Sequence, residues 1–265
     1  MDLIRHDELP RTHKIAHLRD TILVLVNRDM KLRYKRSMIG LAWTMLNPLL
    51  QLLVIGFVFS NILGQVAPHY ASFLFTGLLI WNWFASALVG ATSSIVDNRD
   101  LIKCPEFPHW ILPVVLVTSH MVQFLLSFPL LFLMLFFDHV RLTQVIFALP
   151  LIILLQFILT LSLAYMFATF HVTFRDTQYL LSVILTLAFF FTPVFYEASV
   201  IPEAYQPLFR LNPMAHVLSA YRELLLHGRL PDILLLLFLY LVSVSLLALG
   251  CLIFRKASYR FVEEI

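Results

Sequence analysis

The sequence predicts an all-α integral membrane protein with six transmembrane helices, an amphipathic interfacial helix before them, and a re-entrant segment between spans five and six. Apolar residues make up 60% of the 265 residues and charged residues 13%, whereas a soluble domain carries about 25% charged residues. The charges lie in short stretches between six uncharged runs, and roughly 20 apolar residues suffice for a helix to cross a bilayer. Barrel strands would alternate between apolar and polar residues, which these runs do not.

The six runs define the predicted spans within a single membrane domain, residues 1–265. None of them contains Asp, Glu, Lys or Arg. Their bounds are 41–63, 71–96, 111–137, 145–170, 179–196 and 233–254.

The basic residues predict the orientation of the spans. Fifteen of the 19 Lys and Arg residues lie before the first run, in 97–110, in 171–178 or after residue 254. Cytoplasmic loops carry the excess of Lys and Arg, so we expect both termini in the cytoplasm.

Residues 17–36 predict an amphipathic helix on the inner leaflet. Leu18, Ile22, Leu25 and Val26 recur at helical spacing among six basic side chains. Two interpretations stay open: a topology signal that anchors on lipid phosphates, or a docking site for a partner protein.

Residues 197–228 predict an external segment that is partly re-entrant and partly an amphipathic helix. Pro202 and Pro207 interrupt an otherwise partly apolar stretch, which favours a re-entrant element over a free loop. Asn212 can cap a helix that Pro213 opens and Gly228 closes. The expected apolar face of this helix is Met214, Val217, Leu218, Tyr221, Leu224 and Leu225.

The sequence lacks the residue types that ion-coupled transport, ATP binding and ion conduction require. Uncharged spans argue against a proton- or ion-coupled transporter, since such carriers depend on ionisable groups inside the membrane. No glycine precedes a lysine, so the chain has no phosphate-binding loop for ATP. A Gly-rich filter and an intramembrane carboxylate are also missing, which weakens an ion channel. His120 is the one ionisable side chain well inside a span, and we interpret it as a hydrogen-bonding residue.

Polar side chains in the spans, such as Gln51, Asn82 and Gln156, indicate interhelical hydrogen bonds. The aromatic side chains allow two interpretations. They could stack on sugar rings or anchor helices at the membrane interface.

Short motifs follow one another over residues 20–255. They are Arg28-Asp29-Met30-Lys31-Leu32-Arg33-Tyr34-Lys35 with Gly40, Trp43 and Pro48; Leu101-Ile102-Lys103 with Phe107-Pro108; Phe174-Arg175-Asp176; Thr192-Pro193-Val194-Phe195-Tyr196; Asn212-Pro213-Met214; and Tyr221-Arg222. In this order and spacing they resemble the permease subunits of polysaccharide-exporting ABC transporters, which move O-antigen or teichoic-acid polymers.

The resemblance implies a homodimer of this chain working with two copies of a separate ATP-binding subunit. That subunit would bind ATP and Mg²⁺, so we expect no cofactor, metal or nucleic acid on this chain. The implied substrate is a lipid-linked glycan, and the implied location is the cytoplasmic (inner) membrane of a bacterium, surrounded by membrane lipids.

The resemblance also implies roles for individual residues. Residues expected to couple to the ATPase are Arg28, Asp29, Arg33, Asn98, Leu101, Lys103, Pro108, Arg175 and Asp176. Candidates for the channel wall are Trp43, Trp81, Trp83, Phe84 and Tyr196, and candidates for an external gate are Pro193, Asn212 and Pro213. For Arg175 and Asp176 the alternative is a lipid-phosphate contact and a helix cap.

Three other functions remain as alternatives. A permease for a drug or lipid would share the architecture without sugar-stacking aromatics. A membrane scaffold would transport nothing and would not stimulate an ATPase. A membrane-embedded transferase is the weakest alternative, because its active site would need clustered His, Asp or Glu residues at the membrane interface.

Overall fold

The computed structural model describes residues 11–35, 40–59, 69–104 and 107–264. Within these ranges the chain forms helices and turns and no strand, so the all-α prediction is confirmed. The end of the first predicted span (60–63) and residue 36 of the predicted interfacial helix lie outside the described residues.

Four of the predicted spans coincide with helices long and apolar enough to cross a membrane. They are α3 (Tyr70–Asp97), α5 (Ile111–Leu126) continuing into α6 (Phe128–Phe137), η4 (Gln144–Ala148) with α7 (Leu149–Thr173), and α11 (Ile233–Ala257). The break between α5 and α6 falls at Ser127, just before Pro129, whose ring disfavours helix continuity.

The first and fifth predicted spans correspond to shorter apolar helices. α2 (Trp43–Phe57) and α8 (Thr177–Phe191) have 15 residues each, about 22 Å at 1.5 Å per residue. α8 ends before its predicted bound because Thr192 precedes Pro193 and takes an extended conformation, which the residue before a proline prefers.

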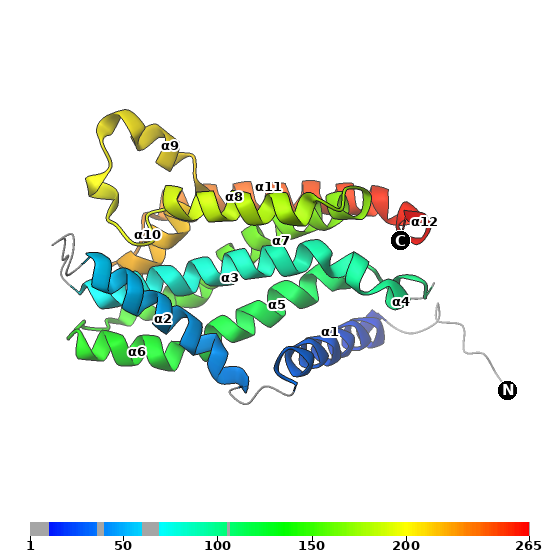
Figure 1. Cartoon of the computed structure of the whole chain (residues 1–265), viewed down its shortest axis with the longest axis horizontal. Coiled ribbons are helices and arrows are strands. Elements are labelled where there is room, and N and C mark those ends of the chain that lie inside the picture. Colours follow the sequence, from blue (N-terminus) through cyan, green and yellow to red (C-terminus); the bar gives the residue numbers. More distant parts are fainter. Residues whose placement is uncertain (1–10, 36–39, 60–68, 105–106, 265) are drawn as a thin grey trace.

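α3 is the central helix of the bundle. Its side chains are buried along most of its length, and it packs on α2, α5, α7 and α8 (Figure 1). α11 lies against α7, and a Cβ atom at Gly250 would be only 2.7 Å from the backbone oxygen of Ser162. The glycine is therefore what allows α7 and α11 to approach so closely.

α1 (Arg11–Tyr34) lies outside the bundle and packs on α5. Leu25 and Val26 are buried against Ile111 and Val115, and the rest of the predicted apolar face packs around them. A helix thus lies where one was predicted, and the four residues of its predicted apolar face pack on or around α5. Other apolar side chains of α1 stay exposed, namely Leu23, Val24 and Leu32.

The segment after α8 forms an arch at one end of the long axis (Figure 1). It contains η5 (Ala198–Val200), η6 (Glu203–Tyr205) and α9 (Gln206–Arg210) and leads into α10 (Pro213–Leu225). The opposite end carries α4 (Arg99–Ile102), the first turns of α1, η7 (Ser258–Arg260) and α12 (Phe261–Glu264).

α10 begins and ends where the sequence predicts. Asn212 accepts a hydrogen bond from the Met214 backbone N–H at 3.0 Å, Pro213 is the first residue, and Gly228 has φ +62° just beyond the end. All six residues of the expected apolar face are buried. α10 packs against α3 and α7 at the end of the bundle.

Candidate functional site

An open groove of about 710 Å³ runs along α3 between α2 and α8. We call it the α2–α8 groove. Gln51 of α2, Asn82 and Ser86 of α3, and Ser182 and Thr186 of α8 supply its neutral polar lining. The Ser182 and Thr186 hydroxyls donate to carbonyl groups of α8 itself at 2.9 and 2.8 Å, and their oxygens can still accept hydrogen bonds. Uncharged amide and hydroxyl groups of this kind suit an uncharged ligand rich in hydroxyl groups.

The two ends of the α2–α8 groove differ in chemistry. Trp81, Phe189 and Phe190 line it toward the α9 end, whereas Arg33 and His120 line it toward α1. Among the described lining residues, Arg33 is the only Lys, Arg, Asp or Glu. The groove therefore combines aromatic faces, neutral hydrogen-bonding groups and one cation.

Some polar side chains also hold the helices together, as the sequence predicts. Asn82 Nδ2 donates to Gln51 Oε1 at 3.0 Å, which joins α3 to α2. Gln156 Nε2 donates to the Ile80 carbonyl at 3.0 Å, which joins α7 to α3. Gln156 is fully buried, so its role is in packing, while Asn82 also faces the groove.

Residues predicted for ATPase coupling in α1 and in the loop after α3 come together on one surface. Arg28 Nη2 donates to Asn98 Oδ1 at 2.8 Å, and Asn98 Nδ2 donates to the Ser94 carbonyl at 2.9 Å, at the end of α3. Leu101 packs against the α1–α5 cluster, Lys103 is exposed, and Pro108 is half-buried. We call the surface formed by Arg28, Asn98, Leu101, Lys103 and Pro108 the α1–α4 surface.

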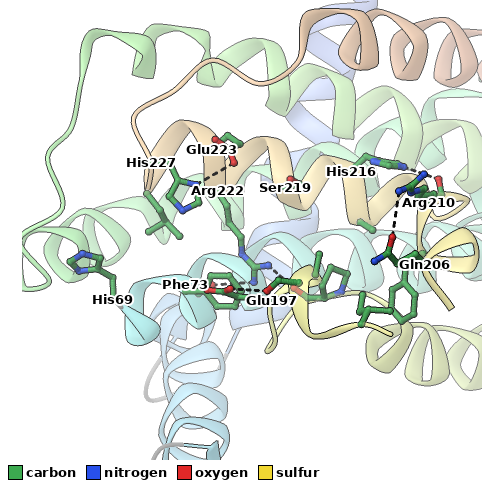
Figure 2. A pocket seen from close by; sticks show the side chains of 17 residues that line it. His69, Phe73, Glu197, Gln206, Arg210, His216, Ser219, Arg222, Glu223 and His227 are labelled. Carbon is green, nitrogen blue, oxygen red and sulfur yellow. Dashed lines mark hydrogen bonds and ion pairs between the residues drawn. The ribbon is translucent and has the colours of Figure 1, made fainter. Parts of the chain in front are cut away.

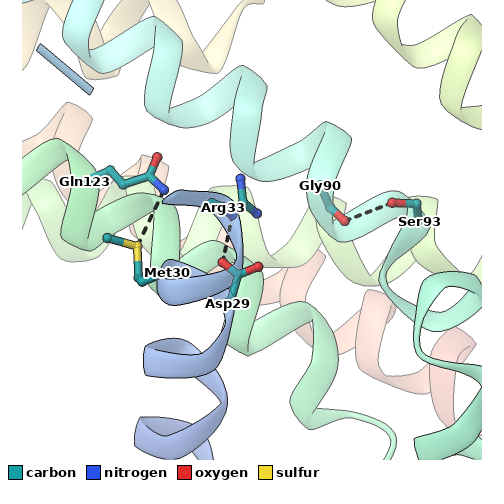
Figure 3. Close-up of polar contacts among 6 residues, drawn as sticks. All are labelled: Asp29, Met30, Arg33, Gly90, Ser93 and Gln123. Carbon is teal, nitrogen blue, oxygen red and sulfur yellow. Dashed lines mark hydrogen bonds and ion pairs between the residues drawn. The ribbon is translucent and has the colours of Figure 1, made fainter. Parts of the chain in front are cut away.

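Arg33 points away from that surface. It lies five residues after Arg28, which is roughly 140° around the helix. Its Nε donates to Asp29 Oδ2 at 2.8 Å, and Gln123 of α5 holds the same end of α1 through Met30 Sδ at 3.5 Å. Figure 3 shows Arg33 between α5 and Gly90 of α3.

Arg175 and Asp176 form an exposed turn between α7 and α8. Arg175 Nη2 donates to the Glu264 carbonyl at 3.4 Å, and Thr173 donates to the Glu264 carboxylate at 2.8 Å. Asp176 occupies the N-cap position of α8, but its side chain makes no capping hydrogen bond there. This turn thus contacts α12, whereas Arg28 contacts Asn98. Both contacts lie at the same end of the molecule.

A buried arginine holds the turn that contains Pro193, one of the three residues predicted for an external gate. Arg222 of α10 is 7% exposed and donates from Nη1 to the Pro193 carbonyl at 2.6 Å and from Nη2 to the Val194 carbonyl at 2.7 Å. Its guanidinium carbon lies 3.4 Å from the centre of the Phe73 ring, a cation–π contact (Figure 2). Burial lowers the Arg222 pKa to about 9 and the Glu197 carboxylate opposes this shift, so the side chain is cationic at neutral pH.

Two further contacts seat the 192–194 turn against the bundle. Asn212 Nδ2 donates to Thr192 Oγ1 at 2.9 Å, which ties the end of α8 to the start of α10. A Cβ atom at Gly77 of α3 would lie 2.6 Å from the Val194 carbonyl oxygen. The turn therefore rests directly on the α3 backbone, with Arg222 across it.

A cavity of about 730 Å³ lies between the arch and α10 (Figure 2). Glu197 and Arg210 line it from the arch. Glu223 of α10 and His227, just after α10, line the other side, with 3.3 Å between His227 Nδ1 and Glu223 Oε1. Its lining is thus more charged than that of the α2–α8 groove.

The five aromatic residues predicted for the channel wall do not line one common surface in the structure. Trp81 lines the α2–α8 groove, and the Phe84 ring packs against the Trp81 ring. Trp83 stacks on Phe124 at 4.8 Å and, with the half-exposed Trp43, lines an adjoining pocket that shares Asn82 and His120 with the groove. Tyr196 donates to the Phe190 carbonyl at 2.9 Å and faces the arch.

Sequence reasoning missed the contribution of α8 to the groove. Ser182 and Thr186 repeat at a spacing of four residues, and Leu185 and Phe189 lie on the same side. This polar stripe within an apolar run was the available signal. In the sequence Arg222 stands out only as part of the Tyr221-Arg222 motif, because sequence does not show that two distant carbonyl groups meet it.

Comparison with known proteins shows what this chain is similar to. A family model described as ABC-2 type transporter matches residues 20–226. The O-antigen export system permease protein RfbA of Myxococcus xanthus is 38% identical over 254 residues, covering 95% of this chain and 98% of that protein. A protein of the same name from Klebsiella pneumoniae is 32% identical over 252 residues, covering 95% and 97%. The polysialic acid transport protein KpsM of Escherichia coli is 22% identical over 246 residues, covering 89% and 92%.

The family match covers well over half of the chain, and the relatives match it over nearly their full lengths. Together with the long apolar helices, these matches show that the chain belongs to the ABC-2 type transporter family of membrane proteins.

Proposed function

We propose that this chain is the permease subunit of an ATP-driven exporter that moves a lipid-linked polysaccharide of the O-antigen type across the cytoplasmic membrane. The observation that carries the proposal is the α2–α8 groove, with its neutral hydrogen-bonding wall and aromatic end. The names of two relatives, 38% and 32% identical to this chain, support the same substrate class.

The groove matches the chemistry of a sugar chain. Sugars present hydroxyl groups around their rings and apolar C–H faces, so amide and hydroxyl side chains pair with the edges and aromatic rings pack on the faces. A chain of many sugars must also leave each position easily. A wall without acidic groups among its described residues provides many weak contacts and no strong trap.

The proposed topology has six spans: α2, α3, α5 with α6, α7, α8 and α11. With the basic residues at the inner side, α1, α4 and α12 face the cytoplasm, and α9, α10 and the arch face outward. The two shorter helices, α2 and α8, border the groove. Spans shorter than the hydrocarbon thickness are accommodated by local thinning of the bilayer.

A homodimer would close the groove into a channel. Side chains of α2 and α8 next to the groove are exposed and apolar, including Leu53, Val54, Val183 and Leu187. A second copy placed against these helices would cover them and set two grooves face to face. The arch, held by Arg222 across the 192–194 turn, would then form the external gate and the re-entrant segment at the channel mouth.

A separate ATP-binding subunit, in two copies, would supply the energy and hold ATP and Mg²⁺. The α1–α4 surface is the proposed docking face, because Arg28 and Asn98 join α1 to the end of α3. A push on this surface would therefore reach the helix that forms the groove floor. Arg175 and Asp176 offer a second contact next to α8.

Depletion of the protein in its host tests the proposal. We expect lipid-linked glycan to accumulate on the inner leaflet while finished polymer at the cell surface falls. Unchanged glycan at both places would refute glycan export and favour the drug or lipid permease.

A matched pair of substitutions tests the groove itself. Phe190 and Phe191 are neighbours on α8 with similar exposure, 58% and 60%, but only Phe190 lines the groove. We expect Phe190→Ala to slow polymer export and Phe191→Ala to leave it near the wild-type rate. Equal export by both variants would show that the groove is not the sugar path.

A further inference from the structure

The α1 end of the α2–α8 groove contains a small recess beside Gly90. A Cβ atom at Gly90 would lie 3.3 Å from His120 Nε2 and 3.7 Å from Arg33 Nη2. Side chains from α5 and α1 thus converge on a position where α3 has no side chain of its own. All three residues line the groove.

Arg33 is held so that one part of its guanidinium remains available to the recess. Its Nε donates to Asp29 Oδ2 at 2.8 Å, one turn earlier on the same helix. Its Nη2 is the atom near Gly90. Asp29 does not line the groove, so its carboxylate orients the arginine from outside.

His120 brings an unused hydrogen-bonding atom to the same recess. The residue is 6% exposed, and Nε2 has no hydrogen-bond partner among the described residues. A buried polar atom without a partner costs free energy, which a ligand in the recess would recover. With the proton on Nε2, the imidazole donates toward the space that Nη2 also faces.

Two nitrogen donors, one of them permanently cationic, form a site for an oxyanion. The groove is open, and the neighbouring exposed faces of α2 and α8 are apolar. A ligand with a lipid tail could therefore keep the tail in hydrocarbon while its charged group reaches Arg33. Because Gly90 has no Cβ, one oxygen of a tetrahedral group can approach the two nitrogens there, while the rest of the group lies in the open groove.

We propose that Arg33, His120 and Gly90 form a phosphate-binding subsite that receives the phosphate linking the glycan to its lipid carrier. This inference rests on the proposed function, because it assigns one part of the substrate to one part of the groove. A phospholipid headgroup or free phosphate shares the same chemistry, so the test must separate these sources.

The test measures binding to the full-length permease, purified with its ATP-binding subunit in phosphatidylcholine nanodiscs. The probes are a polyprenyl diphosphate, the matching polyprenol, phosphatidylglycerol and inorganic pyrophosphate. We expect tight binding of the polyprenyl diphosphate and much weaker binding of the other three.

Two substitutions remove the subsite in different ways. Arg33→Gln removes the cation, and Gly90→Ala fills the recess with a methyl group; each should weaken polyprenyl diphosphate binding about tenfold to a hundredfold. Arg19→Gln, on the exposed side of α1, and Gly56→Ala, which has open space around it, are the matched controls and should bind as wild type.

Wild-type binding by both Arg33→Gln and Gly90→Ala, with unchanged melting temperatures, would overturn the subsite. Equal binding of polyprenol and polyprenyl diphosphate would also overturn it, as would displacement by equimolar phosphatidylglycerol or pyrophosphate. Binding requires no export, so a failure here leaves the exporter proposal standing. Conversely, the depletion experiment can fail while phosphate binding persists.

Discussion

Replacing Gly77 by alanine tests how the proposed gate is seated on α3. The new Cβ atom would lie 2.6 Å from the Val194 carbonyl oxygen and 2.9 Å from Arg222 Nη2. The carbonyl belongs to the backbone, so the 192–194 turn must move away from α3. Overpacking of this kind costs about 1–3 kcal/mol, and the shift also strains the hydrogen bonds of a buried guanidinium.

The matched control is Gly56→Ala in α2, where a Cβ atom would meet nothing within 4 Å. Both changes gain the helix preference of alanine over glycine, about 0.5–1 kcal/mol. The difference between the two variants therefore isolates the clash at Gly77.

The assay is thermal unfolding of both purified variants in the same detergent. At about 2–4 °C per kcal/mol for a chain of this size, Gly77→Ala should melt several degrees below Gly56→Ala. Equal melting temperatures would refute the reasoning, because the turn could not then rest on the α3 backbone.

Three further predictions concern the two ends of the molecule. Arg28→Gln should reduce stimulation of the ATP-binding subunit while leaving the melting temperature nearly unchanged, and Arg19→Gln should change neither the stimulation nor the melting temperature. Equal stimulation by both variants would exclude the α1–α4 surface as the docking face. Arg175→Ala and Asp176→Ala should each let ATP hydrolysis continue while export falls in vesicles, and normal export in both would exclude coupling at that turn. Asn212→Ala loses the cap on α10 and the bond to Thr192, so thermal unfolding should show a loss of about 1 kcal/mol or more; wild-type melting would show that neither contact holds α10.

The helices could be predicted largely because hydrophobic run length and local capping are short-range properties. Asn212 and Pro213 mark the start of α10 within a few residues of sequence, and the structure begins the helix there. The end of α8 was predicted five residues late. Its apolar composition continues past Thr192, while the backbone restriction imposed by Pro193 ends the helix.

The candidate site could be predicted only in part, because facing directions depend on packing. Trp81 and Trp83 are two residues apart on α3, so they point to different neighbours, Phe189 and Phe124. Arg28 and Arg33 were grouped by motif, yet one contacts Asn98 and the other lines the groove. No local pattern indicates which helix will lie opposite each of them.

The close approach of α11 to α7 has a consequence for measuring motion. With the Ser162 carbonyl only 2.7 Å from where a Cβ atom of Gly250 would be, any slide that brings another residue of α11 to this position would push its Cβ atom against that carbonyl oxygen. They therefore serve as a fixed reference frame within the protomer. Spin labels on exposed positions of α8, measured against labels on α11, should report the opening stroke, whereas distances between α7 and α11 should stay constant through the ATP cycle.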